Sequence, residues 1–278
     1  MALGSTFVSR GAAGYDAYMG RWSLRLAPLF LDFAGVAPGE RVLEVGCGTG
    51  SLTAALAQRG DLAGIDAIDY DADFVEVARR RLARPGIRIE QGDACALAFP
   101  DGAYDRALSM LVLHFVSDPS RAVAEMRRVL RRGGVAAACV WDLYGGMPAN
   151  RLFWDPIVAV EPAMAEHWAR AAFRPMTGPG ELRRAFETAG FQGVTETMLP
   201  IRMDFQDFDD FWEPTIWGQG NRAALVAQHG EERLKAAVRT AYLSGRPDGP
   251  RSFASIAWSV RGLVAEGDSE LCRAGKPS

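Results

Sequence analysis

Short apolar runs alternate with longer amphipathic stretches through the first half of the chain. Runs with the length and character of strands occur at 41–45, 63–69, 87–93, 104–110 and 135–141. Stretches with helical periodicity separate several of them, at 51–59, 72–83 and 120–132. Strands that alternate with helices through short loops predict an α/β fold with a parallel, doubly wound sheet.

The helix predicted at 120–132 has a recognisable start and end. Asp118 can cap its first turn, and Pro119 suits the first helical position because the missing N–H costs nothing there. Gly133 and Gly134 follow, and glycine commonly closes a helix because it tolerates a positive φ. We therefore expect the helix to continue as far as these glycines.

The regular alternation stops after Trp141. The next segment is rich in glycine, proline and aromatic residues and has no strand-like run. Beyond it the pattern predicts a helix at 180–190, strands at 194–201 and 252–262, and helical insertions at 204–220 and 231–243. Residues 14–36, before the first strand, read as two short helices.

A glycine-rich turn joins the first predicted strand to the first predicted helix. Gly46, Gly48 and Gly50 lie there, and glycine lets backbone N–H groups approach a ligand closely. The spacing is G-x-G-x-G, whereas the dinucleotide fingerprint is G-x-G-x-x-G, because position 51 is serine. The turn predicts a nucleoside cofactor, although a glycine turn can also be purely structural.

Four aspartates follow in the second strand and the start of the next helix. A ribose-binding carboxylate belongs at the carboxyl end of that strand, beside the glycine turn. Asp69 fits, because the choice of Asp66 would leave Ala67 and Ile68 in a surface loop. Asp71 then suits the helix N-cap, and Asp73 the first turn. Asp66 is left without an assigned role.

A further acid ends the third strand. Asp93 in the run Gly92-Asp93-Ala94 would lie where an adenine binds, and its carboxylate could accept from an exocyclic amino group. The alternative is an aspartate that accepts a bond from its own loop backbone, which is common at such positions.

Four stretches together resemble a known family. They are VLEVGCGTG, AIDYDADFVEVARRR, GDA and the run from Ala103 to Val135. They look like the class I S-adenosylmethionine-dependent methyltransferases, most closely the small-molecule group that includes the ubiquinone and menaquinone biosynthesis enzymes. The resemblance is strong over 40–142 and thins to architecture afterwards. It implies a Rossmann-like, seven-stranded sheet, mostly parallel with the last strand antiparallel, and S-adenosyl-L-methionine as the cofactor.

The resemblance also implies roles for individual residues. The methionine part of the cofactor would meet Gly46, Cys47 and Gly48, with Glu44 as the acid that opens the loop motif. Asp69 would bind the ribose, Tyr70 would flank the adenine, and Gly92, Asp93 and Ala94 would border its edge. The backbone of Ser109, Met110 and Leu111 would receive the cofactor's amino group. Tyr15, Tyr18 and Arg21 occupy a segment that often folds over the cofactor, but each could equally serve helix packing.

These expectations define a domain organisation. Residues 1–39 would form an N-terminal helical lid and 40–142 the cofactor-binding core. Helical insertions at 143–176 and 206–250 would form a cap over the substrate site. The rest of the core would come from 177–205 and 251–264, followed by a tail at 265–278.

Charge and motifs argue for a small-molecule acceptor rather than a nucleic acid. The net charge is −3, so no global basic field would attract a phosphate backbone. No N/D-P-P-Y/F motif follows the fourth strand, which disfavours methylation of amino groups on bases, and no Pro-Cys nucleophile occurs. We expect Trp141, Tyr144, Trp154 and Trp212 to line the acceptor pocket or to pack in the core.

Several other features bear on metal, compartment and assembly. The four cysteines are scattered without a C-x-x-C pair, so we expect neither a metal site nor a disulfide framework. The sequence shows no signal-peptide pattern and no apolar run of membrane-spanning length, so we expect a soluble cytoplasmic protein. Whether the chain forms a homodimer is left open.

His114 is the candidate catalytic residue. It is the first titratable side chain after the fourth strand, and a histidine could act as general base if the acceptor is a hydroxyl. It could instead only hydrogen-bond the cofactor or substrate, or cap the loop. A binding protein without catalysis and a nicotinamide-dependent dehydrogenase are the alternative functions, and the latter would need the later third glycine.

Overall fold

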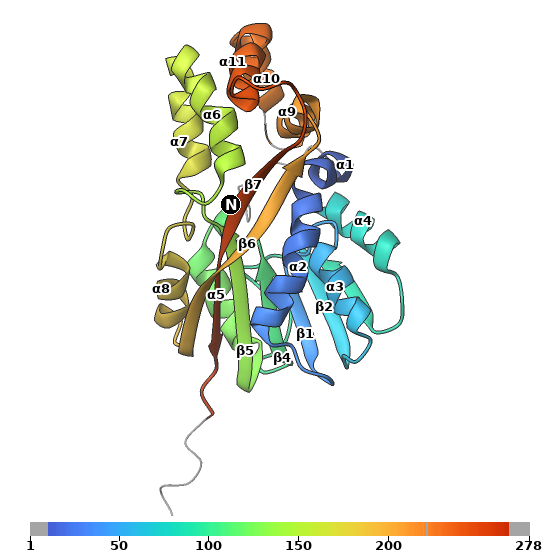
Figure 1. Cartoon of the computed structure of the whole chain (residues 1–278). Coiled ribbons are helices and arrows are strands. Elements are labelled where there is room, and N and C mark those ends of the chain that lie inside the picture. Colours follow the sequence, from blue (N-terminus) through green and yellow to red (C-terminus); the bar gives the residue numbers. More distant parts are fainter. Residues whose placement is uncertain (1–10, 219, 221, 267–278) are drawn as a thin grey trace, which may run out of the picture.

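A seven-stranded mixed sheet forms the centre of the computed structural model, which describes residues 11–218, 220 and 222–266 (Figure 1). Its order is β3-β2-β1-β4-β5-β7-β6. The strands are β1 (Arg41–Val45), β2 (Gly64–Asp69), β3 (Ile87–Gln91), β4 (Tyr104–Met110), β5 (Leu130–Trp141), β6 (Gln192–Phe205) and β7 (Arg251–Leu263). Only β7 runs antiparallel to its neighbours. The predicted Rossmann-like sheet with an antiparallel last strand is therefore confirmed.

Helices cover both faces of the sheet, as a sheet with apolar residues on both sides requires. Alternate residues of β5 show this division. Ala137 and Cys139 belong to the core beneath α2 (Arg21–Ala34) and α3 (Ser51–Arg59). Ala138 and Val140 belong to the core beneath the helices of the opposite face, α5 (Pro119–Arg128) and α8 (Glu181–Thr188). Helix α4 (Ala72–Leu82) packs beside β2 and β3.

The N-terminal helices follow one another without a break. A short helix α1 (Ala12–Tyr15) leads into the π-helical turn η1 (Asp16–Gly20), and α2 begins at the next residue. The first ten residues of the expected lid, and most of the expected tail including Cys272, lie outside the described residues.

The predicted extent of the helix before β5 is wrong. Helix α5 begins at Pro119 with the Asp118 cap, as predicted, but it ends at Arg128. Strand β5 already begins at Leu130, which is buried and pairs with Tyr104 of β4. An irregularity in the β4–β5 register, with Gly133 at φ 71°, accommodates the residues that had the appearance of a last helical turn. Pairing with β4 thus overrides the local helical pattern.

Asp66 has a structural role that its sequence position did not reveal. Its carboxylate accepts from the Tyr104 hydroxyl (2.7 Å), from Arg88 (2.8 Å) and from Arg41 (3.0 Å). Burial alone would raise the pKa of Asp66, but these three donors outweigh burial, and the pKa lies below its ordinary value. Asp66 therefore joins β1, β2, β3 and β4 through an ionic cluster.

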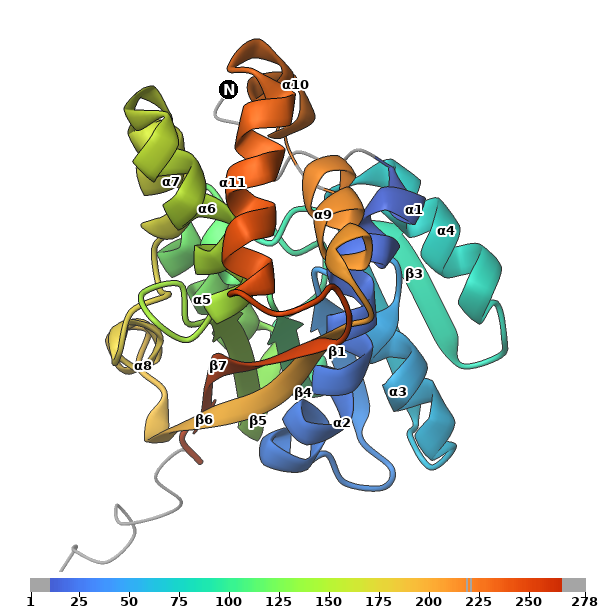
Figure 2. The same cartoon turned by 45° about the horizontal axis from the view of Figure 1, so that its top comes forward.

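Two groups of helices stand beyond the carboxyl ends of the parallel strands, and together we call them the cap (Figures 1 and 2). The first group, between β5 and α8, contains α6 (Pro148–Val160), η3 (Pro162–Met164) and α7 (Ala165–Ala172). The second, between β6 and β7, contains α9 (Phe208–Trp217), α10 (Arg222–Gln228) and α11 (Glu231–Leu243). Helix α6 packs against α11, so the two groups meet. Among the described helices, none combines the length and the apolar character that crossing a membrane requires.

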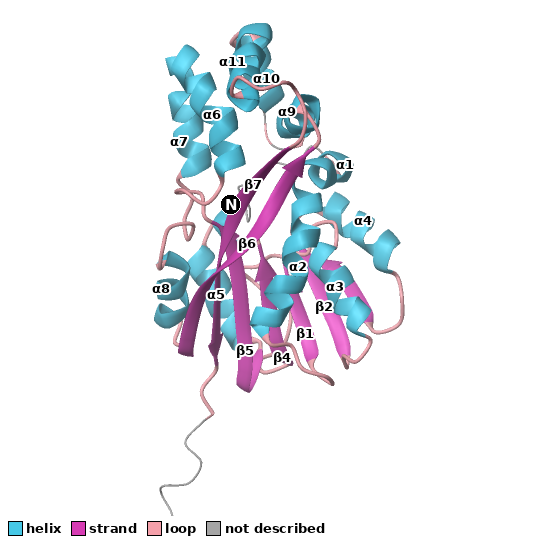
Figure 3. Cartoon of the chain, viewed as in Figure 1, coloured by secondary structure: helices cyan, strands magenta, loops and turns pink. Residues whose placement is uncertain are grey.

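A two-stranded arm carries the second group of cap helices (Figure 3). The β5–β7 pairing ends where Trp141 meets Ala257. The β6–β7 pairing continues past this point, from Pro200 opposite Ile256 to Phe205 opposite Arg251. Residues 200–205 and 251–256 therefore project beyond the sheet as the β6–β7 arm.

Candidate functional site

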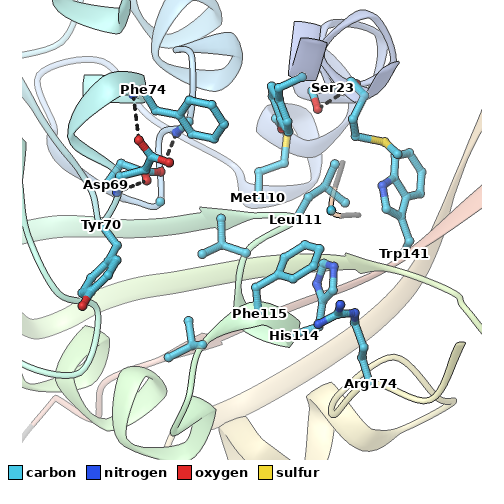
Figure 4. Close-up of a pocket in the computed structure, with 18 of the residues that line it drawn as sticks. Ser23, Asp69, Tyr70, Phe74, Met110, Leu111, His114, Phe115, Trp141 and Arg174 are labelled. Atoms are coloured by element: carbon cyan, nitrogen blue, oxygen red, sulfur yellow. Dashed lines mark hydrogen bonds between the residues drawn. The ribbon is translucent and has the colours of Figure 1, made fainter. Parts of the chain in front are cut away.

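A cavity of about 970 Å³ lies between the carboxyl ends of the parallel strands and the cap. Such a volume is at the upper end of the range for small-molecule sites. The cavity lies outside β1 and β4, where the strand order reverses, which is the usual ligand position in open α/β sheets. Figure 4 shows Asp69, Tyr70 and Phe74 at one end and His114, Trp141 and Arg174 at the other.

Almost all of the site residues expected from the sequence border this cavity. They are Tyr18, Glu44, Gly46, Cys47, Gly48, Asp69, Tyr70, Gly92, Asp93, Ala94, Met110, Leu111 and His114. Ser109 does not line the cavity, because its side chain is fully buried within the sheet. Tyr15 lines the cavity as well, whereas Arg21 forms an ion pair with Asp210 (2.7 Å) and serves helix packing.

The three glycines of the turn have different functions. All three have positive φ. A Cβ on Gly46 would lie 2.4 Å from a methyl group of Val112 and 2.9 Å from its Cβ, so close packing requires glycine there. A Cβ on Gly50 would lie 2.7 Å from the flexible end of Leu82, and the φ of 95° at this position favours glycine. A Cβ on Gly48 would meet only Tyr15 within 4 Å. Gly48 also borders the cavity, so its missing side chain leaves room for a ligand beside the backbone.

Asp69 fastens the glycine turn to the end of β2. The backbone N–H of Gly48 donates to one carboxylate oxygen (2.7 Å), and that of Asp71 donates to the other (2.9 Å). Burial raises the pKa of Asp69, although these two donors lower it. Each carboxylate oxygen has a second lone pair, so Asp69 can also accept from ribose hydroxyls. Asp71 caps α4 by accepting from the N–H groups of Asp73 and Phe74, as predicted.

Glu44 lies deep at the bottom of the cavity. It is 1% exposed and accepts from the Thr53 hydroxyl (2.5 Å). Burial, reinforced by the charge of Asp69, raises the pKa of Glu44 to about 8, against a lowering by Thr53. A cation placed beside this carboxyl would favour its ionised form. The position therefore suits the ammonium group of an amino acid.

Asp93 is engaged with its own loop. One of its carboxylate oxygens accepts from the N–H of Cys95 (2.8 Å), which is the structural alternative considered for this residue. Asp93 still borders the cavity together with Gly92 and Ala94, and Tyr70, which is 45% exposed, lines the same cavity. This end of the cavity can therefore hold a flat, nitrogen-rich ring.

Strained backbone marks the exit of β4. Leu111, directly after the strand, has φ 65°, a conformation that is rare for residues other than glycine. Such strain costs of order 1–3 kcal/mol and is concentrated at functional sites. The N–H of Leu111 donates to the carbonyl of Cys139 (2.8 Å), which helps to hold the strained residue. Leu111 lies in the wall of the cavity, between its two ends (Figure 4).

His114 is buried in the cavity wall on the short helix η2 (Leu113–Phe115). Its ring lies 4.0 Å from that of Phe115, and its Nδ1 has no hydrogen-bond partner among the described residues. Burial, together with the nearby positive charge of Arg174, lowers the pKa of His114 to about 3. The imidazole is therefore neutral at neutral pH and is a weak base before a ligand binds.

The cap supplies an aromatic and basic end to the cavity. Of the four aromatic candidates, Trp141 and Trp154 line it. Trp212 packs in the core against Phe208, and Tyr144 packs against Phe173. Sequence reasoning missed Arg170, Arg174 and Arg222, which also line the cavity. No motif or periodicity distinguished them from the other arginines of the chain.

The chain is similar to known methyltransferases. A family model described as a methyltransferase domain matches residues 43–138. The demethylmenaquinone methyltransferase of Staphylococcus aureus is 30% identical over 172 residues, which cover 58% of this chain and 71% of that protein. The chain belongs to the S-adenosylmethionine-dependent methyltransferases.

Two further comparisons place this methyltransferase among its relatives. The demethylmenaquinone methyltransferase of Renibacterium salmoninarum is 36% identical over 141 residues, which are 49% of this chain and 56% of that protein. This chain thus spans little more than half of that relative's length. The solved phosphoethanolamine N-methyltransferase 2 of Haemonchus contortus has a TM-score of 0.58 at 12% identity, covering 92% of this chain and 57% of that one. At this identity the likeness shows the fold.

The cofactor of this methyltransferase is S-adenosyl-L-methionine, and the residues of the cavity fit it. Gly48 leaves space beside the backbone, Glu44 offers a carboxyl for an ammonium group, and Asp69 offers acceptors for ribose hydroxyls. When bound, the cofactor supplies a methyl group on a positively charged sulfur. The glycine loop and Asp69 would hold the cofactor, and the strained turn at Leu111 lies between the two ends of the cavity (Figure 4).

Proposed function

We propose that this chain transfers a methyl group from S-adenosyl-L-methionine to a small-molecule acceptor held under the cap. The observation that carries the proposal is that one cavity joins the two ends. Residues of the glycine loop and β2 line one end, and cap residues such as Trp154 line the other. A nucleophilic atom of the acceptor would form a bond to the methyl carbon as the bond from carbon to sulfur breaks, and the electron pair of that bond would stay on sulfur.

The chain's residues would contribute mainly by positioning and by exclusion of water. In-line displacement depends on holding nucleophile and electrophile at a short distance, which can supply a large part of the rate. The cap closes the cavity over the strands, and Trp141, Met147 and Trp154 present apolar surface to an acceptor. Relatives named for demethylmenaquinone support an acceptor of small-molecule size.

Binding measurements followed by a transfer assay test the proposal. Calorimetry should detect S-adenosylmethionine and S-adenosylhomocysteine but not NAD. Protein incubated with cofactor carrying a labelled methyl group should then transfer label to at least one member of a metabolite set. Binding of NAD without binding of S-adenosylmethionine or S-adenosylhomocysteine would contradict the cofactor assignment. Binding of cofactor without transfer to any acceptor would instead indicate a binding protein.

We further propose that His114 contacts the acceptor and receives its proton when the acceptor is a hydroxyl. His114→Ala should then lower the rate of transfer by roughly 10²–10⁴, the usual contribution of a positioned base. Cofactor affinity should change little, because His114 lies at the acceptor end of the cavity (Figure 4). The rate should show no inflection from His114 near pH 6.5 in the free enzyme, because burial lowers its pKa to about 3.

His114→Gln is a suitable companion variant, because an amide can hydrogen-bond the acceptor but cannot take up its proton. If the acceptor is a hydroxyl, the rate of methyl transfer by His114→Gln should be nearly as low as that of His114→Ala. An amine or an activated carbon acceptor should show a much smaller loss in both variants, since no difficult proton transfer accompanies the displacement. Loss of cofactor binding in both variants would assign His114 to cofactor binding and end the base assignment.

A further inference from the structure

The charged side chains that line the cavity are separated by sign. The acidic ones all come from the first half of the chain, namely Glu44, Asp69, Asp71, Asp73 and Asp93. The basic ones all come from the cap or its connection to α8, namely Arg170, Arg174 and Arg222. The acids surround the position assigned to the cofactor. The arginines therefore define the charge of the other end.

Arg222 is held in this end by aromatic rings rather than by an acid. Its guanidinium lies 5.1 Å from the centre of the Tyr18 ring and 5.4 Å from that of Phe153, and it donates to the Tyr18 hydroxyl (2.8 Å). The ring of Trp154 lies 5.7 Å away. In the described part of the chain, no carboxylate is within ion-pair distance of Arg222.

Arg174 and Arg170 extend the basic end toward the mouth of the cavity. Arg174 is half-buried and lies 4.5 Å from the centre of the Phe115 ring, next to His114 (Figure 4). Burial lowers the pKa of Arg174, and the positive charge of Arg222 lowers it further, so the two cations repel each other. Arg170 is exposed, contacts the Nδ1 of His167 (3.3 Å), and has no carboxylate partner among the described residues. Positive charges that lie close together in a half-buried site favour the binding of an anion.

Uncharged hydrogen-bond donors at the same end also favour a ligand with acceptor atoms. The indole N–H groups of Trp141 and Trp154 are buried, and neither has an acceptor among the described residues. Both side chains line the cavity. A buried N–H without a partner costs about 1–3 kcal/mol, and an indole N–H can only donate. This end of the cavity thus offers guanidinium and indole hydrogen-bond donors, and it favours a ligand that carries hydrogen-bond acceptors.

We infer that the methyl acceptor carries an anionic group, a carboxylate or a phosphate, bound by Arg174 and Arg222 at the cap end of the cavity. That the bound molecule is the methyl acceptor rests on the proposed function, whereas the anion site itself does not. Guanidinium groups bind both anions through paired, charge-assisted hydrogen bonds. Arg170 at the mouth draws the anion in. With the anion fixed at this end, the nucleophilic atom of the same molecule is directed toward the cofactor end.

Probe binding to the protein saturated with S-adenosylhomocysteine tests the inference without any methyl transfer. Benzoate and phenyl phosphate are the anionic probes, and benzamide is the neutral probe of similar shape; the aromatic ring suits the tryptophan-lined wall. Calorimetry or tryptophan fluorescence measures each dissociation constant. We expect at least one anion to bind roughly 10- to 100-fold more tightly than benzamide, the scale for hydrogen bonds to a charged group. Which anion binds more tightly distinguishes a carboxylate acceptor from a phosphorylated one.

The variants Arg174→Gln and Arg222→Gln should each remove most of this preference and leave benzamide binding unchanged. Arg132→Gln, an exposed arginine outside the cavity, should behave as wild type. Arg174→Lys and Arg222→Lys keep the charge and should retain part of the preference, so a glutamine variant that fails to fold does not end the test. Melting temperatures confirm that the compared variants are folded.

Three outcomes would overturn the inference. Equal binding of benzoate, phenyl phosphate and benzamide by the wild type is one, and binding of none of them is another. The third is weakened binding of S-adenosylhomocysteine in the arginine variants, which would assign the arginines to the cofactor's own carboxylate. Anion preference in a protein that never transfers a methyl group would instead refute the proposed function and leave the anion site standing.

Discussion

Asp69→Ala should weaken the binding of S-adenosylhomocysteine by about 1.5–3 kcal/mol, the worth of hydrogen bonds to a charged group. Two effects add in this variant. The carboxylate that would accept from the ribose is lost, and the N–H groups of Gly48 and Asp71 lose the acceptor that holds the glycine turn. Calorimetry gives the binding free energy, and urea unfolding shows how much stability is lost at the same time.

Asp66→Ala is the matched control, because it removes the same carboxylate three residues earlier in β2. Asp66 does not line the cavity, but it is 6% exposed and joined to Tyr104, Arg88 and Arg41. We expect a loss of about 3 kcal/mol in the free energy of unfolding, at the lower end for a buried ion pair because both arginines remain half-exposed. Cofactor affinity of the folded variant should stay near wild type. If Asp66→Ala weakened binding more than Asp69→Ala, the ribose assignment would be wrong.

The free energy of unfolding of the cofactor-free protein should fall as pH rises from about 6.5 to about 8.5, and Glu44→Gln should remove most of this fall. Glu44 has a pKa of about 8 in the folded protein against an ordinary value of 4.5. The folded state therefore keeps a proton that the unfolded chain releases, and its contribution to stability is complete below pH 4.5 and is lost as pH rises through 8. The full loss, between pH 4.5 and pH 8, is on the order of 5 kcal/mol.

A second buried group, His114, sets the pH window for this measurement, because its pKa is shifted in the opposite direction from that of Glu44. The pKa of His114 is lowered from 6.5 to about 3, so its contribution is complete above pH 6.5 and is lost as pH falls toward 3. Above pH 6.5 the Glu44 contribution is thus separated from that of His114. Urea unfolding of wild type and Glu44→Gln at several pH values checks the prediction, and equal slopes in the two proteins would contradict it. Saturation with S-adenosylmethionine should flatten the wild-type slope, if the ammonium group lies beside Glu44.

The cofactor half of the molecule could be predicted from sequence because its signals are local. The bounds of β1 and β4 are those that the apolar runs predict, and the caps Asp71 and Asp118 act as expected. The register of β2 followed from keeping Ala67 and Ile68 within the strand, which places Asp69 at its end. In each case neighbouring residues along the chain determine the outcome.

Features that depend on partners distant in the chain could not be predicted in this way. The start of β5 is determined by pairing with β4, which no local pattern reveals. The arginines that cluster in the sequence, at 79–81 and at positions 127, 128, 131 and 132, do not line the cavity. The arginines that do line it occur singly, and Arg174 and Arg222 come together only because the two groups of cap helices meet.

The β6–β7 arm has a consequence for how such enzymes diversify. The register that holds β7 in the sheet lies between Ala257 and Leu263, whereas the segment 206–250 is covalently connected to β6 and β7 at the far end of the arm. At about 3.4 Å per residue, the six paired positions of the arm place that junction roughly 20 Å beyond the sheet. A lineage can therefore lengthen, shorten or exchange this segment without altering the strand pairing or the glycine turn. Because residues such as Arg222 in this segment line the cavity, changes in the segment would alter the acceptor end while the cofactor end keeps its residues.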